Sequence, residues 1–376
     1  MQRPLPYGYE GFGAAHWREP WQVGALRFEE AIATTVALMT MTEALKTSVS
    51  SCMREMRLLL ERVGQDWEVM PYGSFANGFG TQLSTLKCTC FIVGEKLVSQ
   101  NTMRDASRLL ELRICPVFER HDRFVIRDVS IECGLLVIKL KFDGVLNVEF
   151  SCYNLTPLSS DRLLHAYASL DWRIRLVVLI AEYWCSRVCP RVPPDIIAYI
   201  VLYAMQVDEE IRLPVFPMDA FEHSGAWEHD DRVRNLRGAW QCTLTPVALL
   251  SRFFKFYAQD FQWGHEIVSI CTGRRWTDGS EVWKRLSSCG SGEIPVEHPY
   301  EWQRNYVDQV PKSDGEALRR AFGNTLYELS MGLVPQALTL HGDATGSQEG
   351  SSSEAERDPE AVLGTVWHCR DWPMSV

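Results

Sequence analysis

The pattern of apolar positions first predicts a helix. Residues 1–24 carry glycine, proline and aromatic residues without a period, so we expect an irregular arm there. Farther along, apolar side chains recur three and four positions apart, which is typical of one face of an α-helix. This stripe consists of Leu45, Val49, Cys52, Met56, Leu59 and Val63. Thr40-x-x-Glu43 has the spacing of a capping box and Gly64 follows the stripe, which predicts the two ends of the helix.

Strand-like segments follow this helix. A glycine-rich turn covers residues 72–80, and an apolar, β-prone run covers residues 88–93. Residues 103–114 are amphipathic, and we expect this segment to end before Pro116. Asp143-Gly144, a dipeptide typical of hairpin turns, joins two further β-rich runs, at 135–142 and 145–151.

Helical patterns dominate the second half of the chain. They cover residues 161–168, 171–188, 195–206, 245–260 and 316–331. After Pro335, glycine, serine and acidic residues replace the apolar ones. We therefore expect an irregular arm at 1–24, a mixed α/β domain at 25–155, a helical domain at 156–336 and an acidic, disordered tail at 337–376.

Composition narrows the class of protein. The chain has 376 residues, 46% of them hydrophobic, and a formal net charge of −10. These values exclude a mostly disordered chain and a strongly basic nucleic-acid binder, although a local basic groove remains compatible with them. No apolar run reaches the roughly 18 residues of a membrane span, and the start lacks the apolar core of a secretory signal. We read the 12 cysteines as reduced thiols, which predicts a soluble, intracellular protein.

Gly73-Ser74 in the glycine-rich turn is the first candidate for chemistry. Glycine lets a backbone approach a phosphate closely, and a serine hydroxyl can donate a hydrogen bond to one. Alone, however, a Gly-Ser pair in a turn is usually only part of the turn. Other segments of the chain are needed to distinguish a phosphate-binding turn from an ordinary turn.

Several of those segments together resemble one family. They are Val148-Glu149-Phe150-Ser151-Cys152-Tyr153-Asn154, Glu182-Tyr183-Trp184-Cys185-Ser186, Ala198-Tyr199, Leu249–Ala258 and Glu297-His298-Pro299-Tyr300. With these motifs the chain resembles the noncanonical poly(A) polymerases and terminal uridylyltransferases of the DNA polymerase β-like nucleotidyltransferase superfamily, over roughly residues 28–335. The resemblance implies an α+β, bilobal nucleotidyltransferase fold. A palm domain with a small mixed β-sheet would occupy 25–155, and a helical central, poly(A)-polymerase-associated domain would occupy 156–336.

The resemblance also implies a catalytic centre in which three carboxylates hold two Mg²⁺ ions. The first two carboxylate positions correspond here to Thr85 and Lys87, and only the third, Glu149, is acidic. Mg²⁺ prefers anionic oxygen ligands, whereas threonine is a neutral, poor ligand and an ammonium repels the ion. Residues 69–94 contain no Asp or Glu, so no shift of the alignment supplies a ligand. We therefore expect a degenerate site that holds no metal.

The positions that bind the nucleotide in the family are altered as well. The resemblance assigns them to Gly73, Ser74, Asn154, Glu182, Ser186, Ala198 and Tyr199. Glu182 and Ser186 replace two triphosphate-binding lysines, and Ala198 replaces a serine. Tyr199 keeps the residue that stacks on the incoming base in relatives. Because the lysines and the metal ligands are replaced, we nevertheless expect nucleotide binding to be weak or lost.

Lys87 and Glu149 suggest what fills the degenerate site. On neighbouring palm strands, as the resemblance implies, their side chains would face the same pocket. Our hypothesis is that the Lys87 ammonium replaces the charge of the metal and pairs with Glu149. The alternative is that both side chains are partly solvated and merely tolerated.

These replacements predict a pseudoenzyme that acts as a scaffold or as a subunit of an RNA-processing complex. We expect protein partners from such a complex, RNA as a possible ligand, no cofactor, and neither a membrane nor DNA as a partner. One alternative is an active, template-independent RNA adenylyl- or uridylyltransferase with an atypical metal site, which would use Mg²⁺ or Mn²⁺ with an NTP. Another is an RNA-binding module that shields 3′ ends.

Overall fold

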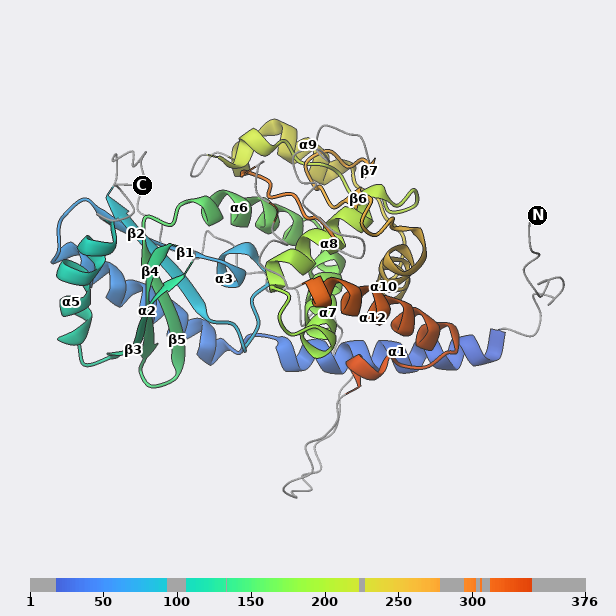
Figure 1. The fold of residues 1–376 in the computed structure, drawn as a ribbon, viewed down its shortest axis with the longest axis horizontal. Coiled ribbons are helices and arrows are strands. Elements are labelled where there is room, and N and C mark those ends of the chain that lie inside the picture. The colour runs from blue at the N-terminus through green and yellow to red at the C-terminus, as the bar shows by residue number, and fades with distance from the viewer. Residues whose placement is uncertain are drawn as a thin grey trace, which may run out of the picture.

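The computed structural model describes residues 18–92, 106–132, 134–222, 227–277, 294–301, 305 and 312–339. A five-stranded sheet with its helices lies at one end of the molecule, and a mostly helical part lies at the other (Figure 1). This architecture confirms the predicted α+β fold class with a small mixed sheet.

The sheet has the strand order β1-β2-β5-β4-β3. Its strands are β1 (Trp67–Tyr72), β2 (Leu86–Ile92), β3 (Phe124–Glu132), β4 (Leu135–Phe142) and β5 (Leu146–Cys152). β2 and β5 run parallel, and every other neighbouring pair runs antiparallel. The predicted hairpin joins β4 and β5, where Asp143 and Gly144 have φ of 49° and 70°, the left-handed values that a tight hairpin turn requires.

The predicted helix after the arm is α2 (Glu43–Glu61), but the predicted cap is wrong. Thr42, not Thr40, precedes the helix in an extended conformation, and its hydroxyl accepts the Leu45 N–H at 3.2 Å. The Thr40 hydroxyl instead donates to the Val36 carbonyl of the preceding helix. Two threonines in similar surroundings were available, and the turn between the helices decided which of them caps α2.

The amphipathic segment does not end before Pro116. Its described part begins at residue 106 and passes through a π-helical turn, η1 (Leu110–Ile114), into α5 (Cys115–Glu119). Pro116 follows directly on this π-helical turn. A proline interrupts the regular hydrogen-bond pattern of an α-helix, but the backbone at η1 does not follow that pattern, and the helix continues past Pro116.

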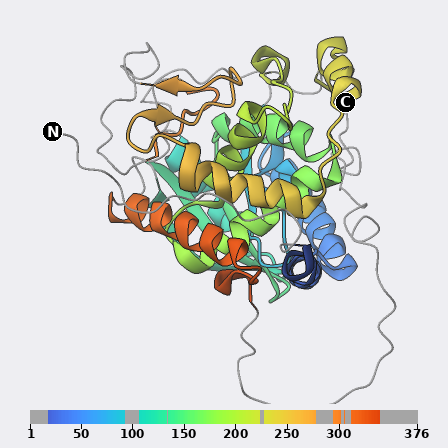
Figure 2. The same ribbon diagram turned by 90° about the vertical axis from the view of Figure 1, so that its right-hand side faces the viewer.

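The helical part contains most of the remaining elements. They are α1 (Arg18–Met39), α6 (Thr156–Ala168), α7 (Trp172–Val188), α8 (Pro194–Val207), η2 (Met218–Phe221), η3 (Trp227–His229), α9 (Asp231–Ala239), α10 (Pro246–Lys255), η4 (Phe256–Asp260), α12 (Lys312–Ser330) and η6 (Gln336–Leu338), with the two short strands β6 (Glu266–Ile267) and β7 (Trp276–Thr277). α10 and α12 pack beside each other in this helical part (Figure 2). The five predicted helical runs fall on α6, α7, α8, α10 with η4, and α12.

Buried apolar side chains form two separate clusters. One joins α2, α5 and the sheet, and the other joins α1, α6, α7, α8, α10 and α12. α8 is buried almost throughout because it is apolar on every face, which makes it the central helix of the second cluster. The domain boundaries at 25–155 and 156–336 stay a prediction, although α1 buries Phe28 and Ile32 in the helical cluster.

Both ends of the chain differ from expectation or lie outside the description. α1 begins at Arg18, so part of the arm expected to be irregular is helical. Of the predicted tail, residues 337–339 are described and the rest lies outside the described residues. No described helix is long and apolar enough to cross a membrane.

Candidate functional site

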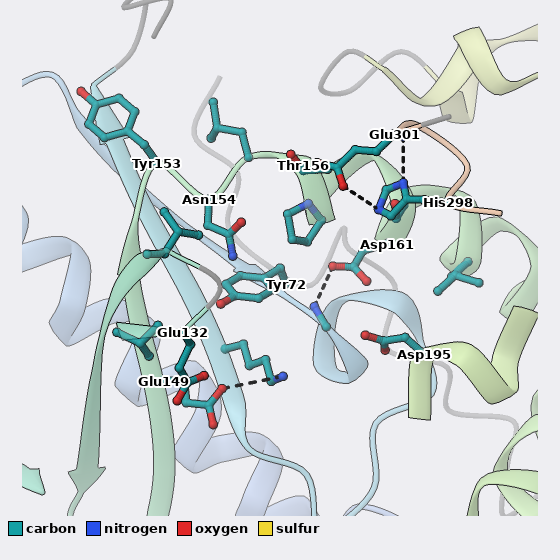
Figure 3. A pocket seen from close by; sticks show the side chains of 18 of the residues that line it. Tyr72, Glu132, Glu149, Tyr153, Asn154, Thr156, Asp161, Asp195, His298 and Glu301 are labelled. Carbon is teal, nitrogen blue, oxygen red and sulfur yellow. Dashed lines mark hydrogen bonds and ion pairs between the residues drawn. The ribbon is translucent and has the colours of Figure 1, made fainter. Parts of the chain in front are cut away.

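A cavity of about 400 Å³ lies between the sheet and the helical part. Side chains from all five strands of the sheet, α6 and α8 line it, together with His298 and Glu301 (Figure 3). Of the residues assigned from the sequence, five line this cavity: Gly73, Lys87, Glu149, Asn154 and Tyr199. Thr85, Ser74, Glu182, Ser186 and Ala198 are not among its lining residues.

The Gly-Ser turn is held from α6 by a buried carboxylate. Gly73 has φ of +74°, which favours glycine, and Ser74 begins the short helix α3 (Ser74–Asn77). The Gly73 N–H donates to Asp161 Oδ2 at 2.6 Å, and the Asn77 side-chain amide donates to Asp161 Oδ1 at 3.4 Å. Asp161 therefore fixes the turn, a role that our sequence analysis missed.

The surroundings of Asp161 disfavour its charge. Burial, with the Asp195 carboxylate acting in the same direction, raises the pKa of Asp161 well above its usual value. The hydrogen bonds from Gly73 and Asn77 act in the opposite direction and are too weak to cancel that effect. An acid in the helix that follows Asn154 was the only signal in the sequence.

Lys87 and Glu149 face each other across β2 and β5, which run parallel and in register at these residues. The Lys87 ammonium lies 3.7 Å from Glu149 Oε2, and the side chains are 44% and 23% exposed. Burial lowers the pKa of Lys87, but Glu149, Asp195 and other nearby anions outweigh it and leave the pKa raised. The two side chains of our hypothesis are thus paired, and they are also partly solvated.

The pair belongs to a row of alternating charges across the sheet. Lys139 of β4 lies opposite Glu149 in the register of β4 and β5. Its ammonium lies 2.7 Å from Glu132 and 4.0 Å from Asp128, both on β3. Because side chains alternate between the two faces of a strand, residues in register share one face of the sheet. A cation therefore stands on either side of Glu149.

This arrangement does not fit the two Mg²⁺ ions that the family resemblance implies. Thr85 lies before β2 and does not line the cavity, and Lys87 places an ammonium beside the only remaining carboxylate of the three. Among the residues that the structure describes, no group of three or more His, Cys, Asp and Glu side chains could hold a metal ion. The donor set is thus unsuited to hard divalent cations.

The two positions on α7 offer nothing to a triphosphate. The Ser186 hydroxyl is exposed and donates to the Tyr183 carbonyl at 2.6 Å. Glu182 is half-buried, and desolvation together with the nearby Asp195 carboxylate raises its pKa well above the usual value. Neither side chain can supply the positive charge that a polyphosphate requires.

The remaining assigned positions are buried or engaged. Ala198 and Tyr199 of α8 are each 1% exposed, so the Tyr199 ring offers no open face for stacking. The Asn154 backbone N–H donates to Thr89 Oγ1 at 2.9 Å, which ties the end of β5 to β2. Tyr199 and Asn154 thus form part of the cavity wall, and Ala198 does not line the cavity.

His298 and Glu301 close one rim of the cavity. His298 Nδ1 accepts the backbone N–H groups of Tyr300 at 3.1 Å and of Glu301 at 2.9 Å. His298 Nε2 lies 3.9 Å from Glu301 Oε2 (Figure 3). The imidazole accepts two backbone N–H groups and so holds the local turn as an Asp carboxylate would.

Comparisons with known proteins agree on one family. Residues 247–304 match the family described as Cid1 family poly A polymerase. Poly(A) RNA polymerase GLD2-B of Xenopus laevis is 23% identical over 283 residues, which cover 72% of this chain and 51% of the relative. Terminal uridylyltransferase cid1 of Schizosaccharomyces pombe is 24% identical over 237 residues, which cover 57% of this chain and 55% of the relative.

The solved structures agree on the fold. Cid1 poly(U) polymerase bound to MgGTP aligns with a TM-score of 0.63 at 19% identity, over 83% of this chain and 95% of that one. A GLD-2/RNP-8 complex aligns with a TM-score of 0.64 at 19% identity, over 85% and 98%. The chain spans about half the length of the curated relatives that it matches. The matched segment, the relatives and the fold thus agree that the chain is similar to the noncanonical poly(A)/poly(U) polymerases.

Proposed function

We propose that this chain is a noncatalytic member of its family and acts as a scaffold or subunit of an RNA-processing complex. The observation that carries the proposal is the Lys87 ammonium 3.7 Å from Glu149, at the positions that the family resemblance gives to metal ligands. The relatives named above are RNA-tailing enzymes, so the complex would be one that acts on RNA.

Electrostatics supports the loss of catalysis. A unit charge 4 Å from a divalent ion contributes about 8 kcal/mol at an effective dielectric constant of 20, twice the value for two unit charges. With Lys87 in place this contribution is repulsive, whereas a carboxylate there would make it attractive. Replacing one residue therefore removes a ligand and adds a barrier to the ion.

The charge of the cavity also opposes a polyphosphate. Five carboxylates line it, those of Glu132, Glu149, Asp161, Asp195 and Glu301, against the single ammonium of Lys87. Even with two of these acids held partly neutral by their raised pKa values, the walls carry excess negative charge. A nucleoside triphosphate without bound metal would be repelled.

A role in an assembly follows from what the fold retains. The chain keeps the fold of the family, while the positions of the metal ligands and the triphosphate-binding residues are changed. This combination is expected of a protein that acts by binding other molecules through its surface. In one of the similar structures GLD-2 is bound to RNP-8, which gives a precedent for a protein partner on this fold. We propose a protein partner of that general kind for this chain, with RNA as a possible further ligand.

Extension of a labelled RNA tests the loss of catalysis. The purified chain is incubated with a 3′-unpaired RNA, each NTP in turn, and either Mg²⁺ or Mn²⁺, and products are resolved by length. We expect no extension above a no-protein control. Extension that disappears in Glu149→Gln would show an active site built on the remaining carboxylate and would refute the proposal.

Filter binding of the same RNA tests the alternative of an RNA-binding module. The dependence of affinity on salt reports how many phosphates the protein neutralises. We expect weak binding with a shallow salt dependence, since the cavity is acidic. Tight binding with a steep dependence would favour a module that shields 3′ ends.

A further inference from the structure

The acidic cavity contains one carboxylate that no neighbour neutralises directly. Glu149 faces Lys87, Glu132 faces Lys139, and Asp161 accepts the Gly73 N–H. Asp195, in the first turn of α8, has no hydrogen bond or ion pair among the described residues and senses Lys87 only through its charge. A half-buried carboxylate without a partner is unfavourable unless a bound molecule provides a hydrogen bond or a positive charge.

A second, independent feature lies in the same cavity wall. Ser160 of α6 lines the cavity and is 3% exposed, yet its hydroxyl has no hydrogen-bond partner among the described residues. A buried hydroxyl that lacks a partner costs about 1–3 kcal/mol, so native structures rarely leave one unpaired. Asp195 can accept hydrogen bonds and Ser160 can accept or donate one, which together suit a ligand that carries N–H groups.

Other parts of the wall suit an apolar stem. Leu135, Val137 and Leu164 line the cavity, as do the aromatic residues Tyr72 and Tyr153. Methylene groups pack well on such a surface, and a cation is attracted to the face of an aromatic ring. A cavity lined by both acidic and apolar side chains therefore suits a cation on a chain of methylenes.

We propose that this cavity binds an organic cation, an ammonium or guanidinium group on an apolar stem, with Asp195 and Ser160 as its polar partners. The proposal rests on the noncatalytic function argued above, because an active enzyme would need the same cavity for a triphosphate. Two sources carry this chemistry, a free polyamine and the arginine or lysine side chain of a protein. The excess of carboxylates in the cavity wall favours a cation over an anion. The experiment below distinguishes a free polyamine from a protein side chain.

Isothermal titration calorimetry on the whole chain at low salt tests the proposal with two probes. Spermidine stands for the free polyamine, and N-acetyl-arginine amide stands for a protein side chain. We expect saturable binding of at least one probe, about tenfold weaker in Asp195→Asn and several-fold weaker in Ser160→Ala. Because burial raises the pKa of Asp195, binding should also release protons, which makes the measured heat depend on the ionisation enthalpy of the buffer.

Glu209→Gln is the matched control, since it removes one charge from an exposed position away from the cavity. Cation binding that weakens equally in Glu209→Gln and Asp195→Asn would be attraction to the net charge of the chain and would overturn the proposal. The proposal would also be overturned if neither spermidine nor N-acetyl-arginine amide bound. Circular dichroism confirms that each variant is folded, and the RNA extension assay reports separately on the proposed loss of catalysis.

Discussion

At the scale of single residues, exposure sets how much the Lys87–Glu149 pair can contribute to stability. A fully buried pair leaves an uncompensated charge when one partner is removed, whereas an exposed pair contributes little. With side chains 44% and 23% exposed, this pair lies between the two limits. Its main consequence is therefore chemical, because it places a positive charge where the family resemblance implies a metal.

Lys87→Ala should lower the free energy of unfolding by about 1 kcal/mol, less than the 3–5 kcal/mol of a fully buried pair. Removing the lysine leaves Glu149 beside the other acids of the cavity. Lys87→Ala/Glu149→Gln should recover part of the loss because it removes that repulsion. Urea denaturation measures both variants, and a double variant no more stable than the single one would show that the pair is unimportant.

Asp161→Asn should gain stability relative to the parent chain as the pH rises. The pKa of Asp161 is raised in the folded state, so the parent loses stability as the pH rises from the unfolded pKa, near 4, through the folded pKa. Asparagine keeps an oxygen for the Gly73 N–H and does not titrate. Urea denaturation at pH 4 and pH 8 should show a larger advantage for Asp161→Asn at pH 8.

Asp161→Leu separates the hydrogen bond from the charge. Leucine removes the acceptor of the Gly73 N–H, so this variant should be about 1–3 kcal/mol less stable than Asp161→Asn at pH 8. Equal stability of the two variants would contradict the role of Asp161 in holding the turn.

At the scale of elements, the two helices at the start of the chain show how tertiary contacts select among equivalent local signals. Thr40 and Thr42 both stand between α1 and α2, and only Thr42 has the extended backbone and the hydrogen bond of a cap. The sequence alone placed the cap two residues early. It could not weigh the end of α1, which uses the Thr40 hydroxyl.

Thr42→Ala should lower the free energy of unfolding by about 1 kcal/mol, the usual effect of losing a helix cap. Thr40→Ala is the matched control and should have a smaller effect, since its hydroxyl only adds a second bond to the Val36 carbonyl. Thermal and urea denaturation of the two variants measure the difference. The reverse order would mean that the capping box predicted at Thr40 is the one that forms.

At the scale of the whole molecule, a buried arginine connects the glycine-rich turn to the helical part. Arg175 of α7 is 5% exposed, and its Nε–H donates to the Gly78 carbonyl at 2.7 Å. Burial lowers the pKa of Arg175, although an arginine stays charged at any physiological pH. This bond and the one from Gly73 to Asp161 anchor the same turn at both ends.

Arg175→Met should loosen the turn at residues 73–80 while leaving the sheet folded. Methionine keeps the apolar stem but leaves the Gly78 carbonyl without its donor, a loss of about 1.5–3 kcal/mol for a charge-assisted bond. Hydrogen exchange read by mass spectrometry should increase in residues 73–80 and not in β4. Equal increases in both segments would instead indicate global destabilisation.

The family resemblance predicted the fold class, and local patterns predicted the hairpin between β4 and β5 and the five helical runs of the second half. The local patterns succeeded because apolar periodicity and turn dipeptides act over a few residues. It missed Asp161, Asp195 and Ser160, because an acid or a serine on a helix reads as an ordinary polar position. Only packing shows that these side chains turn toward one cavity.

The sequence by itself determined which residue types occupy the family positions, and thus that Thr85 and Lys87 stand where carboxylates are implied. Tertiary structure decided what those residues do. In-register pairing of parallel strands set Lys87 against Glu149, and the approach of α6 and α8 to the sheet gathered acids far apart in the chain. The electrostatic potential at a site depends on all charged groups nearby in space. The order of residues along the chain therefore could not predict the acidic character of this cavity.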